Sequence, residues 1–350
     1  MKVLYLYAET MGYNLATIRA LVRRGAEVHL VHDDRIKATP YQIPVEPGVC
    51  QYPASTLSRA GLSQLASLIS PDLTVVSGWV NRDYLAVATQ IRSTGAVVVT
   101  GLDNQWRGTI RQYGAAFACQ FGYLERYFSH VWVAGHRQYE YARRLGFSQS
   151  QIIFDLYSAD LDLFHRAYVN NFENKQKTYP HRFLYVGRFV PAKGLDILIN
   201  AWKRTEGRRG DWELHLVGNG PMREALTKTA GIVVKDFMQP EELHREVAGA
   251  GCFVLPSRTE PWGVVVHEFC AAGLPLVLSD EVGAATSFLL SGFNGFCFPA
   301  EDDEALAQAL IRVAALPDES LLNMGKHSHK LSRRITPDTS AANLLAALIK

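Results

Sequence analysis

Short apolar runs recur along the first 135 residues. They are VLYLYA (3–8), EVHLVH (27–32), LTVVSG (73–78), AVVVTG (96–101) and HVWVAG (130–135). Helical patterns lie between them; in NLATIRALVRRG (14–25), apolar residues recur at helical spacing and Gly25 ends the pattern. Apolar strands that alternate with helices predict a parallel sheet covered on both faces.

A polar segment, HRAYVNNFENKQKTYPHR (165–182), interrupts this alternation without helical periodicity, so we expect a domain boundary there. The alternation then resumes. Its strands are RFLYVG (182–187), ELHLVG (213–218), GIVV (231–234), GCFVLP (251–256), PLVLS (275–279) and GFCF (295–298), with helices over 194–204 and from Pro221. The pattern predicts two doubly wound α/β domains, 1–165 and 166–335. A last helix over 336–350, capped by Asp338 or Thr339, can return to the first domain.

Composition narrows the class of protein. The chain has 350 residues, 48% of them hydrophobic, and a net charge of +2, which suits two ordinary cores and favours no nucleic-acid partner. Its five cysteines are odd in number and widely spaced, which argues against a disulfide framework or a zinc site. The N-terminus lacks a signal-peptide pattern and no long apolar run occurs, so we expect a cytoplasmic location.

The loops after the strands of the second half carry the candidate chemistry, because ligands of open α/β sheets bind at the carboxyl ends of strands. RFVPAKG brings Arg188 and Lys193 to a strand–helix junction beside Gly187, an arrangement that suits a diphosphate. Taken alone, such a turn is more often a solvated basic loop. The next loop contains Gly218 and Asn219. Taken alone, this is a common sequence before a helix begins and is weak evidence for a binding site.

Two carboxylates, Glu260 and Glu268, stand eight positions apart in SRTEPWGVVVHEFCAAGLP (257–275), and Gly263 is expected to begin a helix between them. Eight helical residues span about 12 Å, the length of a sugar, a diphosphate and a ribose in a row. Glu260 could then accept hydrogen bonds from sugar hydroxyls and Glu268 from ribose hydroxyls, while the first helical amides face the diphosphate. Alternatively, Glu260 caps the helix and Glu268 is a surface acid.

These segments together resemble the retaining, family-4-type glycosyltransferases of GT-B fold. Glu260 to Glu268 resembles their E-x7-E element, FLYVGRFVPAKGLDILINAW their donor-phosphate strand–loop–helix, and LHLVGNGP the strand and loop that follow. YSADLDLF (157–164) resembles their NGVDxxxF segment, with Asp160 and Phe164 matching. The resemblance covers residues 157–300 in order and spacing.

The resemblance implies two facing Rossmann-like domains with a deep interdomain cleft, the acceptor on the first and the nucleotide-sugar donor on the second. It assigns Arg188 and Lys193 to the diphosphate, Glu268 to the ribose and Glu260 to the donor sugar. The main chain of VVKDFMQPEEL (233–243) would flank the nucleobase. The donor-binding residues so implied are Gly12, Gly187, Arg188, Lys193, Gly218, Asn219, Phe237, Glu260, Trp262, Gly263, Val264, Val265 and Glu268.

The first domain departs from the family pattern. Its first loop, AETMGYN, has Gly12 where the family often has a glycine pair, and Leu102 stands where many members have a histidine. Asp103 remains as a candidate for acceptor alignment or proton acceptance, and Glu9 is a second candidate. The alternative for Asp103 is a loop residue that caps a turn.

The DLD triplet (160–162) lies in the matched interdomain segment and is not interpreted as a metal site. Charge develops on the leaving diphosphate, and Arg188, Lys193 and the helix amides would stabilise it. We therefore expect neither a metal nor another cofactor, and we assign no nucleophile on the protein.

An aromatic and basic stretch spans residues 107–128. Its members are Arg107, Arg111, Phe117, Phe121, Tyr123, Arg126 and Phe128. Burial of the aromatic side chains in the core is favoured; acceptor binding and contact with a membrane surface are the alternatives.

The favoured function is transfer of a sugar from a nucleotide-diphosphate sugar, UDP by family frequency, to a glycan, lipid-linked or other acceptor. The location would be the cytoplasm or the inner face of the membrane. Alternatives are another GT-B enzyme such as a sugar-nucleotide epimerase, or a binding or scaffold subunit without turnover. A dinucleotide-dependent oxidoreductase is disfavoured because no GxGxxG follows the first strand.

Overall fold

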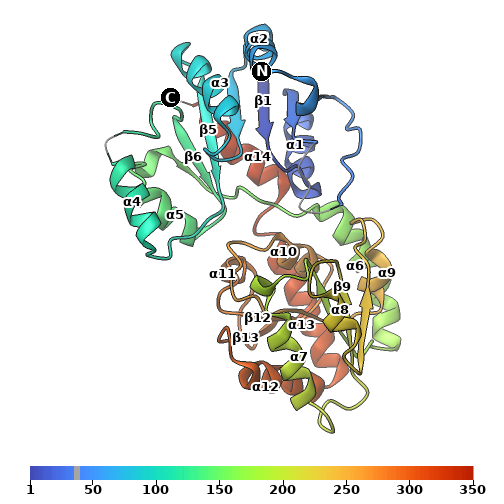
Figure 1. The fold of residues 1–350 in the computed structure, drawn as a ribbon. Helices are drawn as coiled ribbons and strands as arrows, with labels where there is room; N and C mark the ends of the chain where they lie inside the picture. Colours follow the sequence, from blue (N-terminus) through green and yellow to red (C-terminus); the bar gives the residue numbers. More distant parts are fainter. Residues whose placement is uncertain (35–39, 121, 350) are drawn as a thin grey trace. The chain divides into compact units, whose positions relative to one another are not determined.

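The computed structural model describes residues 1–34, 40–120 and 122–349. Phe121, in the aromatic stretch, and Lys350, at the end of the predicted last helix, lie outside the described residues. The chain forms two compact units, Met1–Ser158 with Ile335–Lys350 and Ala159–Arg334. Each unit is a parallel sheet flanked by helices (Figure 1).

The sheet of the first unit has seven parallel strands in the order β3-β2-β1-β4-β5-β6-β7. The strands are β1 (Lys2–Tyr7), β2 (Glu27–His32), β3 (Val49–Pro53), β4 (Leu73–Val76), β5 (Val97–Leu102), β6 (His130–Val133) and β7 (Ile152–Ile153). The helices are α1 (Gly12–Arg23), α2 (Arg59–Ile69), α3 (Arg82–Ser93), α4 (Ile110–Cys119), α5 (His136–Arg144) and α14 (Pro337–Ala346), with 3-10 turns at Ala54–Thr56 and Gln149–Gln151. Every residue of β4 is buried, as expected for a central strand covered on both faces.

The sheet of the second unit has six parallel strands in the order β10-β9-β8-β11-β12-β13. The strands are β8 (Arg182–Val186), β9 (Glu213–Val217), β10 (Ile232–Lys235), β11 (Cys252–Leu255), β12 (Leu276–Ser279) and β13 (Gly295–Phe298). The helices are α6 (Leu161–Lys177), α7 (Leu195–Arg204), α8 (Arg223–Thr227), α9 (His244–Ala248), α10 (Val264–Ala271), α11 (Ala285–Phe288), α12 (Asp303–Ala314) and α13 (Asp318–Ser332), with a 3-10 turn at Pro191–Lys193. The helix expected from Pro221 thus begins two residues later.

The strand order of each sheet reverses at one point, and the loops on either side of that point diverge at the carboxyl edge. The reversal lies between β1 and β4 in the first unit and between β8 and β11 in the second. Ligands of doubly wound sheets bind at such a switch point. In the second unit the two loops concerned are those after β8 and after β11, which carry the predicted cationic and acidic residues.

The polar segment in which a domain boundary was expected is instead a helix, α6, and the two units divide between Ser158 and Ala159 rather than at 165/166. Helix α6 packs against α9, α10 and α13, all of the second unit. Its inward positions include Phe164 and Ala167, and even Lys175 is buried. The wide polar face of α6 hid this narrow apolar stripe in the sequence.

The C-terminal helix α14 packs on α1, and Figure 1 shows it in red against the blue and green elements of the first unit. Its cap is Thr336, whose side chain accepts from the amide of Thr339, rather than Asp338 or Thr339. Asp338 instead pairs with Arg23 of α1, at 3.2 Å. Asp338 therefore forms a long-range ion pair with Arg23, whereas the sequence had suggested it as a cap of its own helix.

Strands β3 and β7 were not predicted. Strand β7 has two residues, and β3 is a half-buried edge strand that pairs only with β2 among the described residues. An edge strand needs no continuous apolar run, which is why its sequence, VCQYP, carries little signal. None of the described helices has the length and apolar character needed to span a membrane.

Candidate functional site

An ion pair between Lys193 and Glu260 joins the two loops at the switch point of the second unit. Lys193 Nζ donates to Glu260 Oε2, and the two side chains are only 15% and 9% exposed. Ser257 Oγ donates to the same carboxylate oxygen at 3.3 Å. Both predicted residues are therefore held in place, with the charge of the carboxylate balanced by the lysine.

Arg258 fastens the same two loops to each other. Its guanidinium donates to both carboxylate oxygens of Asp196, at 2.6 Å each, and to the carbonyl of Pro191 at 2.8 Å. It also pairs with Glu301 at 2.6 Å. The Arg258 hydrogen bond lowers the pKa of Asp196 below its ordinary value. The turn that presents Lys193 and the loop that presents Glu260 thus share one charged anchor.

Glycines allow the backbone to approach closely at two points of this site. Gly263 has a φ of +88°, and a Cβ added there would lie 2.9 Å from Glu260 Cγ. Gly218 has a φ of +152°, and a Cβ there would lie 1.9 Å from the carbonyl oxygen of Gly187. Neither position has room for a larger residue, so the loops after β8 and β9 lie directly against each other.

Helix α10 begins where predicted, with Gly263 as N-cap and Val264 as its first residue. The first amides of a helix have no intrahelical acceptor and lie at the positive end of its dipole. Val264 and Val265 are half-buried. Because residues 261–263 are not helical, the 12 Å helical span expected between the two carboxylates does not apply. The first amides of α10 nonetheless lie at its N-terminus beside Glu260, where a helix dipole is positive.

Glu268 lies in the second turn of α10. Burial and, secondarily, the charge of Asp160 raise the pKa of Glu268 to about 7. Asp160 is itself the N-cap of α6, where its carboxylate accepts from the amide of Leu163 at 3.2 Å. Asp160 thus has a structural role as a cap. Glu268 is poised between its neutral and charged forms near neutral pH.

The loop after β8 leaves Arg188 exposed. Tyr185 Oη donates to the carbonyl oxygen of Arg188 at 2.9 Å, and the amide of Phe189 donates to that of Asn219 at 2.8 Å. Within the described residues the guanidinium of Arg188 has no ion-pair partner. An open groove beside this loop is lined by Asn219, Gly220, Pro221, Arg223, Glu224, Thr227 and Lys228. The two cations of this groove are paired with acids, Arg223 with Asp236 at 3.1 Å and Lys228 with Glu224 at 2.6 Å.

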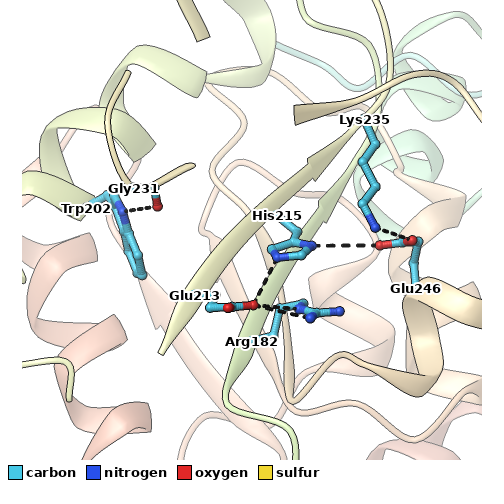
Figure 2. A network of polar contacts seen from close by, with 7 residues as sticks. All are labelled: Arg182, Trp202, Glu213, His215, Gly231, Lys235 and Glu246. Atoms are coloured by element: carbon cyan, nitrogen blue, oxygen red, sulfur yellow. Dashed lines mark hydrogen bonds and ion pairs between the residues drawn. The ribbon is translucent and has the colours of Figure 1, made fainter. Parts of the chain in front are cut away.

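A polar network around the buried side chains of His215 and Glu246 holds the segment predicted to flank the nucleobase (Figure 2). His215 Nε2 lies 3.1 Å from Glu213, which also pairs with Arg182 at 3.2 Å. On the other side of the ring, Glu246 lies 3.9 Å from His215 Nδ1 and binds Lys235 at 2.6 Å. Burial and the two cations lower the pKa of His215. The network ties β8, β9 and β10 to α9.

A main-chain hydrogen bond also positions the end of β10, which precedes Phe237 of the segment predicted to flank the nucleobase. The carbonyl of Lys235 accepts from the amide of Gly218 at 3.1 Å, which links the end of β10 to the loop after β9. Phe237 follows two residues later and is half-buried. The position of this strand end is thereby fixed relative to the loop after β9.

Trp262 and His267 lie in the core of the second unit. The ring of Trp262 is 3% exposed and packs edge-on to Phe288, and its Nε1 has no hydrogen-bond partner among the described residues. His267 is fully buried; its Nδ1 accepts from the amide of Ala159 and its Nε2 donates to the carbonyl of Ser332. Burial lowers the pKa of His267 to about 4. His267 is therefore a neutral structural residue.

Residues 169–331 match the family model described as glycosyl transferases group 1. This segment is a group 1 glycosyl transferase domain. Among curated proteins, the chain is 32% identical over 146 residues to a GDP-mannose-dependent α-(1-6)-phosphatidylinositol monomannoside mannosyltransferase of Mycolicibacterium smegmatis, covering 38% of each chain. It is 31% identical over 158 residues to an exopolysaccharide phosphotransferase of Streptomyces coelicolor, covering 43% of this chain and 17% of that one. The chain thus spans less than half the length of these relatives.

Solved structures resemble the whole chain. A sucrose-phosphate synthase of Thermosynechococcus elongatus has a TM-score of 0.74 at 18% identity, over 98% of this chain and 96% of that one. The Anabaena protein HepE in complex with UDP-glucose has a TM-score of 0.71 at 18% identity, over 100% and 99%. The predicted GT-B fold, with two Rossmann-like units, is confirmed.

Outside the glycosyl transferase domain, Asp103 follows β5 directly. Tyr157 Oη donates to its carboxylate at 3.3 Å, and Gln138 Nε2 donates to its main-chain oxygen at 2.8 Å. The ring of Tyr13 packs edge-on against Tyr157 with centroids 5.0 Å apart. Burial, followed by the nearby Asp103 carboxylate, raises the pKa of Tyr157 well above its ordinary value. The Asp103 side chain thus has a neutral hydrogen-bond donor beside it.

The other two predicted residues of the first unit occupy the loop after β1. Gly12 is the first residue of α1, after the N-cap Met11, so its amide belongs to the first turn of the helix. Glu9 is exposed. Neither the role of Gly12 nor that of Glu9 is decided by a contact in the described part of the unit.

The aromatic stretch does not lie wholly in the core. Phe128 is buried as favoured, but Phe117 is 66% exposed and Tyr123 is 41% exposed. The interpretation of these two as core residues was wrong. Short aromatic patterns predict burial only on average, and here one helix faces outward.

Arg258 and Tyr157 belong to the candidate sites but were not predicted from the sequence. They lie inside the segments SRTEPWG and YSADLDLF, which contain predicted residues. In the sequence, only their nearness to predicted residues could have indicated a role. Arg258 stands two residues before Glu260, and Tyr157 stands three residues before Asp160. Their partners, Asp196 and Asp103, are 62 and 54 residues away, and such pairings carry no local pattern.

Proposed function

We propose that the chain is a retaining glycosyltransferase that moves a sugar from a nucleotide-diphosphate sugar to a glycan, lipid-linked or other acceptor, without a metal ion. The observation that carries the proposal is the Lys193–Glu260 pair beside the start of α10, at the switch point of a group 1 glycosyl transferase domain. One relative is named as GDP-mannose-dependent and one structural neighbour holds UDP-glucose. We take UDP as the first carrier to test and GDP as the second.

The proposed chemistry places positive potential where charge develops. As the bond from the anomeric carbon to the diphosphate breaks, the electron pair passes to the diphosphate oxygen. Arg188, Lys193 and the first amides of α10 supply fixed positive groups for that charge. Lys193 donates to Glu260 in the structure and has further N–H groups for a phosphate oxygen.

Two carboxylates are proposed to bind the ends of the donor. Glu260 Oε2 is occupied by Lys193 and Ser257, which leaves Oε1 for a sugar hydroxyl. Glu268 is proposed to accept from the ribose hydroxyls. Phe237, Trp262, Gly187, Gly218 and Asn219 are proposed to contribute through the loops that they form. Asp103, in the first unit, is proposed to align the acceptor or take its proton.

The direct test is release of nucleoside diphosphate. The protein is incubated with UDP- and GDP-sugars, in the presence of a chelator, with and without an extract of glycans and lipid-linked saccharides. We expect slow donor hydrolysis that accelerates with acceptor, and a product with the anomeric configuration of the donor by NMR. Tight donor binding with no turnover in any extract would instead favour a binding subunit.

A further inference from the structure

Arg223, the first residue of α8, joins the loop after β9 to the loop after β10. Its Nη1 donates to the carbonyl oxygens of Gly218 and Lys235, at 3.3 Å each. Its Nη2 pairs with the carboxylate of Asp236 at 3.1 Å. One side chain therefore contacts three residues on two loops. A guanidinium is suited to this because its five N–H donors point in fixed directions.

The main chain of Arg223 is also held in place. Its amide donates to the carbonyl of Gly220 at 3.0 Å, and the amide of Met222 donates to the carbonyl of Phe189 at 3.1 Å. A Cβ added at Gly220 would lie 2.5 Å from the same carbonyl oxygen of Phe189, so the two segments lie directly against each other. The arginine side chain therefore starts from a point that is fixed against the loop after β8.

Lys235, the last residue of β10, is held at both its main chain and its side chain. Its carbonyl accepts from the amide of Gly218 at 3.1 Å as well as from Arg223. Its Nζ donates to the buried carboxylate of Glu246, on α9, at 2.6 Å (Figure 2). Residues 236–239 follow and lie outside helices and strands. Their path therefore depends on where Lys235 and Asp236 are held.

We propose that Arg223 is a positioning residue for the nucleoside end of the donor. By holding Lys235 and Asp236 against the loop after β9, it would set Phe237 at the distance from that loop that a base joined to a ribose diphosphate requires. The carboxylate of Asp236 offsets the charge of Arg223, which favours positioning over direct attraction of the diphosphate. The inference rests on the proposed function and deepens it, because it names a residue that acts on base recognition through another segment.

Isothermal titration with the full chain tests the positioning role. The ligands are pyrophosphate and either UDP or GDP, whichever the unmodified chain binds more tightly. Arg223→Met should weaken binding of the nucleotide about tenfold, the effect of a weakened contact between a base and an aromatic ring. It should leave the affinity for pyrophosphate unchanged. Arg223 and Asp236 have side chains that are 32% and 79% exposed, so the variant should remain folded.

Two conservative variants separate geometry from charge. Arg223→Lys keeps the cation but cannot reach three acceptors, so it should lose nearly as much nucleotide affinity as Arg223→Met. Asp236→Asn keeps both main-chain contacts of the arginine and should lose less. With a nucleotide-sugar donor, Arg223→Met should raise KM and leave kcat unchanged, because the base is bound equally in the ground state and the transition state.

The matched control is Lys228→Gln, which removes the second cation of the same groove and breaks its pair with Glu224 at 2.6 Å. This variant should change neither affinity. An equal loss in Lys228→Gln would overturn the inference, because the charge of the groove would then be responsible. Equal losses of nucleotide and pyrophosphate affinity in Arg223→Met would also overturn it, since the arginine would then act on the diphosphate or on the whole unit.

The measurements distinguish failure of this inference from failure of the proposed function. If the unmodified chain binds the nucleotide but releases none from a sugar donor, the transferase proposal fails and the comparison of Arg223 variants still holds. If the chain transfers sugar and Arg223→Met binds the nucleotide normally, only the positioning role fails. Binding of neither UDP nor GDP would overturn both.

Discussion

The guanidinium of Arg258 binds both carboxylate oxygens of Asp196, and this one contact sets the loop of Glu260 against the turn of Lys193. The main chain supports it, since the amide of Arg258 donates to the carbonyl of Ala192 at 2.9 Å. The two chemically important side chains are thus positioned by a residue that is not expected to touch the donor. A planar guanidinium with two parallel hydrogen bonds is suited to this role.

The first prediction follows from that anchor. Arg258→Ala should weaken binding of a UDP- or GDP-sugar about tenfold, because the cation of Lys193 and the carboxylate of Glu260 lose their fixed spacing. Arg258→Lys should rescue little, since an ammonium cannot form the paired hydrogen bonds. Isothermal titration measures both.

The control for the Arg258 variants is Arg204→Ala, which breaks the pair of Arg204 with Asp303 at 3.1 Å on the same unit. Donor affinity should be unchanged in this control. Equal losses in Arg204→Ala and Arg258→Ala would show that the effect is general destabilisation rather than positioning.

A second prediction concerns the Lys193–Glu260 pair. Lys193→Ala leaves the largely buried Glu260 carboxylate without its partner, so the free energy of unfolding should fall by about 3 kcal/mol. The double variant Lys193→Met/Glu260→Gln removes both charges and should recover most of that stability without recovering donor binding. Denaturant unfolding and donor titration separate the two effects. Unchanged donor affinity in Lys193→Ala would contradict the assignment of Lys193 to the phosphate.

The third prediction is a pH dependence of donor binding. The pKa of Glu268 is about 7, and the charged carboxylate accepts stronger hydrogen bonds from hydroxyl groups than the neutral acid does. Affinity for a nucleotide sugar, whose diphosphate keeps its charge in this range, should therefore fall as pH drops from 8 to 6. The loss of affinity should approach about tenfold, because the charged fraction of Glu268 decreases by that factor between these pH values.

Glu268→Gln should bind weakly and show a flat pH profile, because the titrating group has been removed. A profile of the same slope in this variant would assign the titration to another group. His267, whose pKa is about 4, should not contribute in the range tested.

A fourth prediction concerns stability. Lys175 is buried on α6, its Nζ donates to the carbonyl of Ala250 at 2.7 Å, and burial lowers its pKa to about 7. The unfolded chain, in which a lysine has a pKa of about 10.4, then binds more protons between these values. Stability from this group should therefore rise as pH increases from about 7 to about 10.

Lys175→Met should remove that slope and raise the melting temperature at pH 7 by about 3 °C, because no charge remains to be buried. Calorimetry at several pH values gives the difference in melting temperature between the variant and the unmodified chain, in which the effects of the other titrating groups cancel. A difference that stays constant with pH would contradict the lowered pKa of Lys175.

The fifth prediction separates the acceptor from the donor. Asp103→Asn should leave donor affinity unchanged and lower transfer about a hundredfold, the usual contribution of a positioned proton acceptor. Tyr157→Phe, which removes the hydroxyl that donates to Asp103, should have a smaller effect on transfer. If Asp103→Asn transfers at the normal rate, the aspartate is a turn residue only.

Local patterns in the sequence were sufficient for much of the fold. The apolar runs predicted eleven of the strands, as in β8 and β11, because a strand covered on both faces needs consecutive apolar residues. The helix start at Gly263 was equally predictable, since helix starts have local chemistry. The glycosyl transferase match rests on the same segments. An edge strand such as β3 is paired on one side only and needs no run of consecutive apolar residues, so it was not predicted.

Contacts between distant segments were decided only by the tertiary structure. The sequence marked Lys193 and Glu260 as site residues, but not that they bind each other, nor that Arg258 fixes both through Asp196. The sequence also suggested a domain boundary where α6 lies, and it favoured a core position for Phe117. These contacts and the burial of these side chains depend on which helix and loop surfaces pack together after the sheet has formed. Hydrophobic periodicity records that a face is apolar, whereas the folded chain determines what covers it.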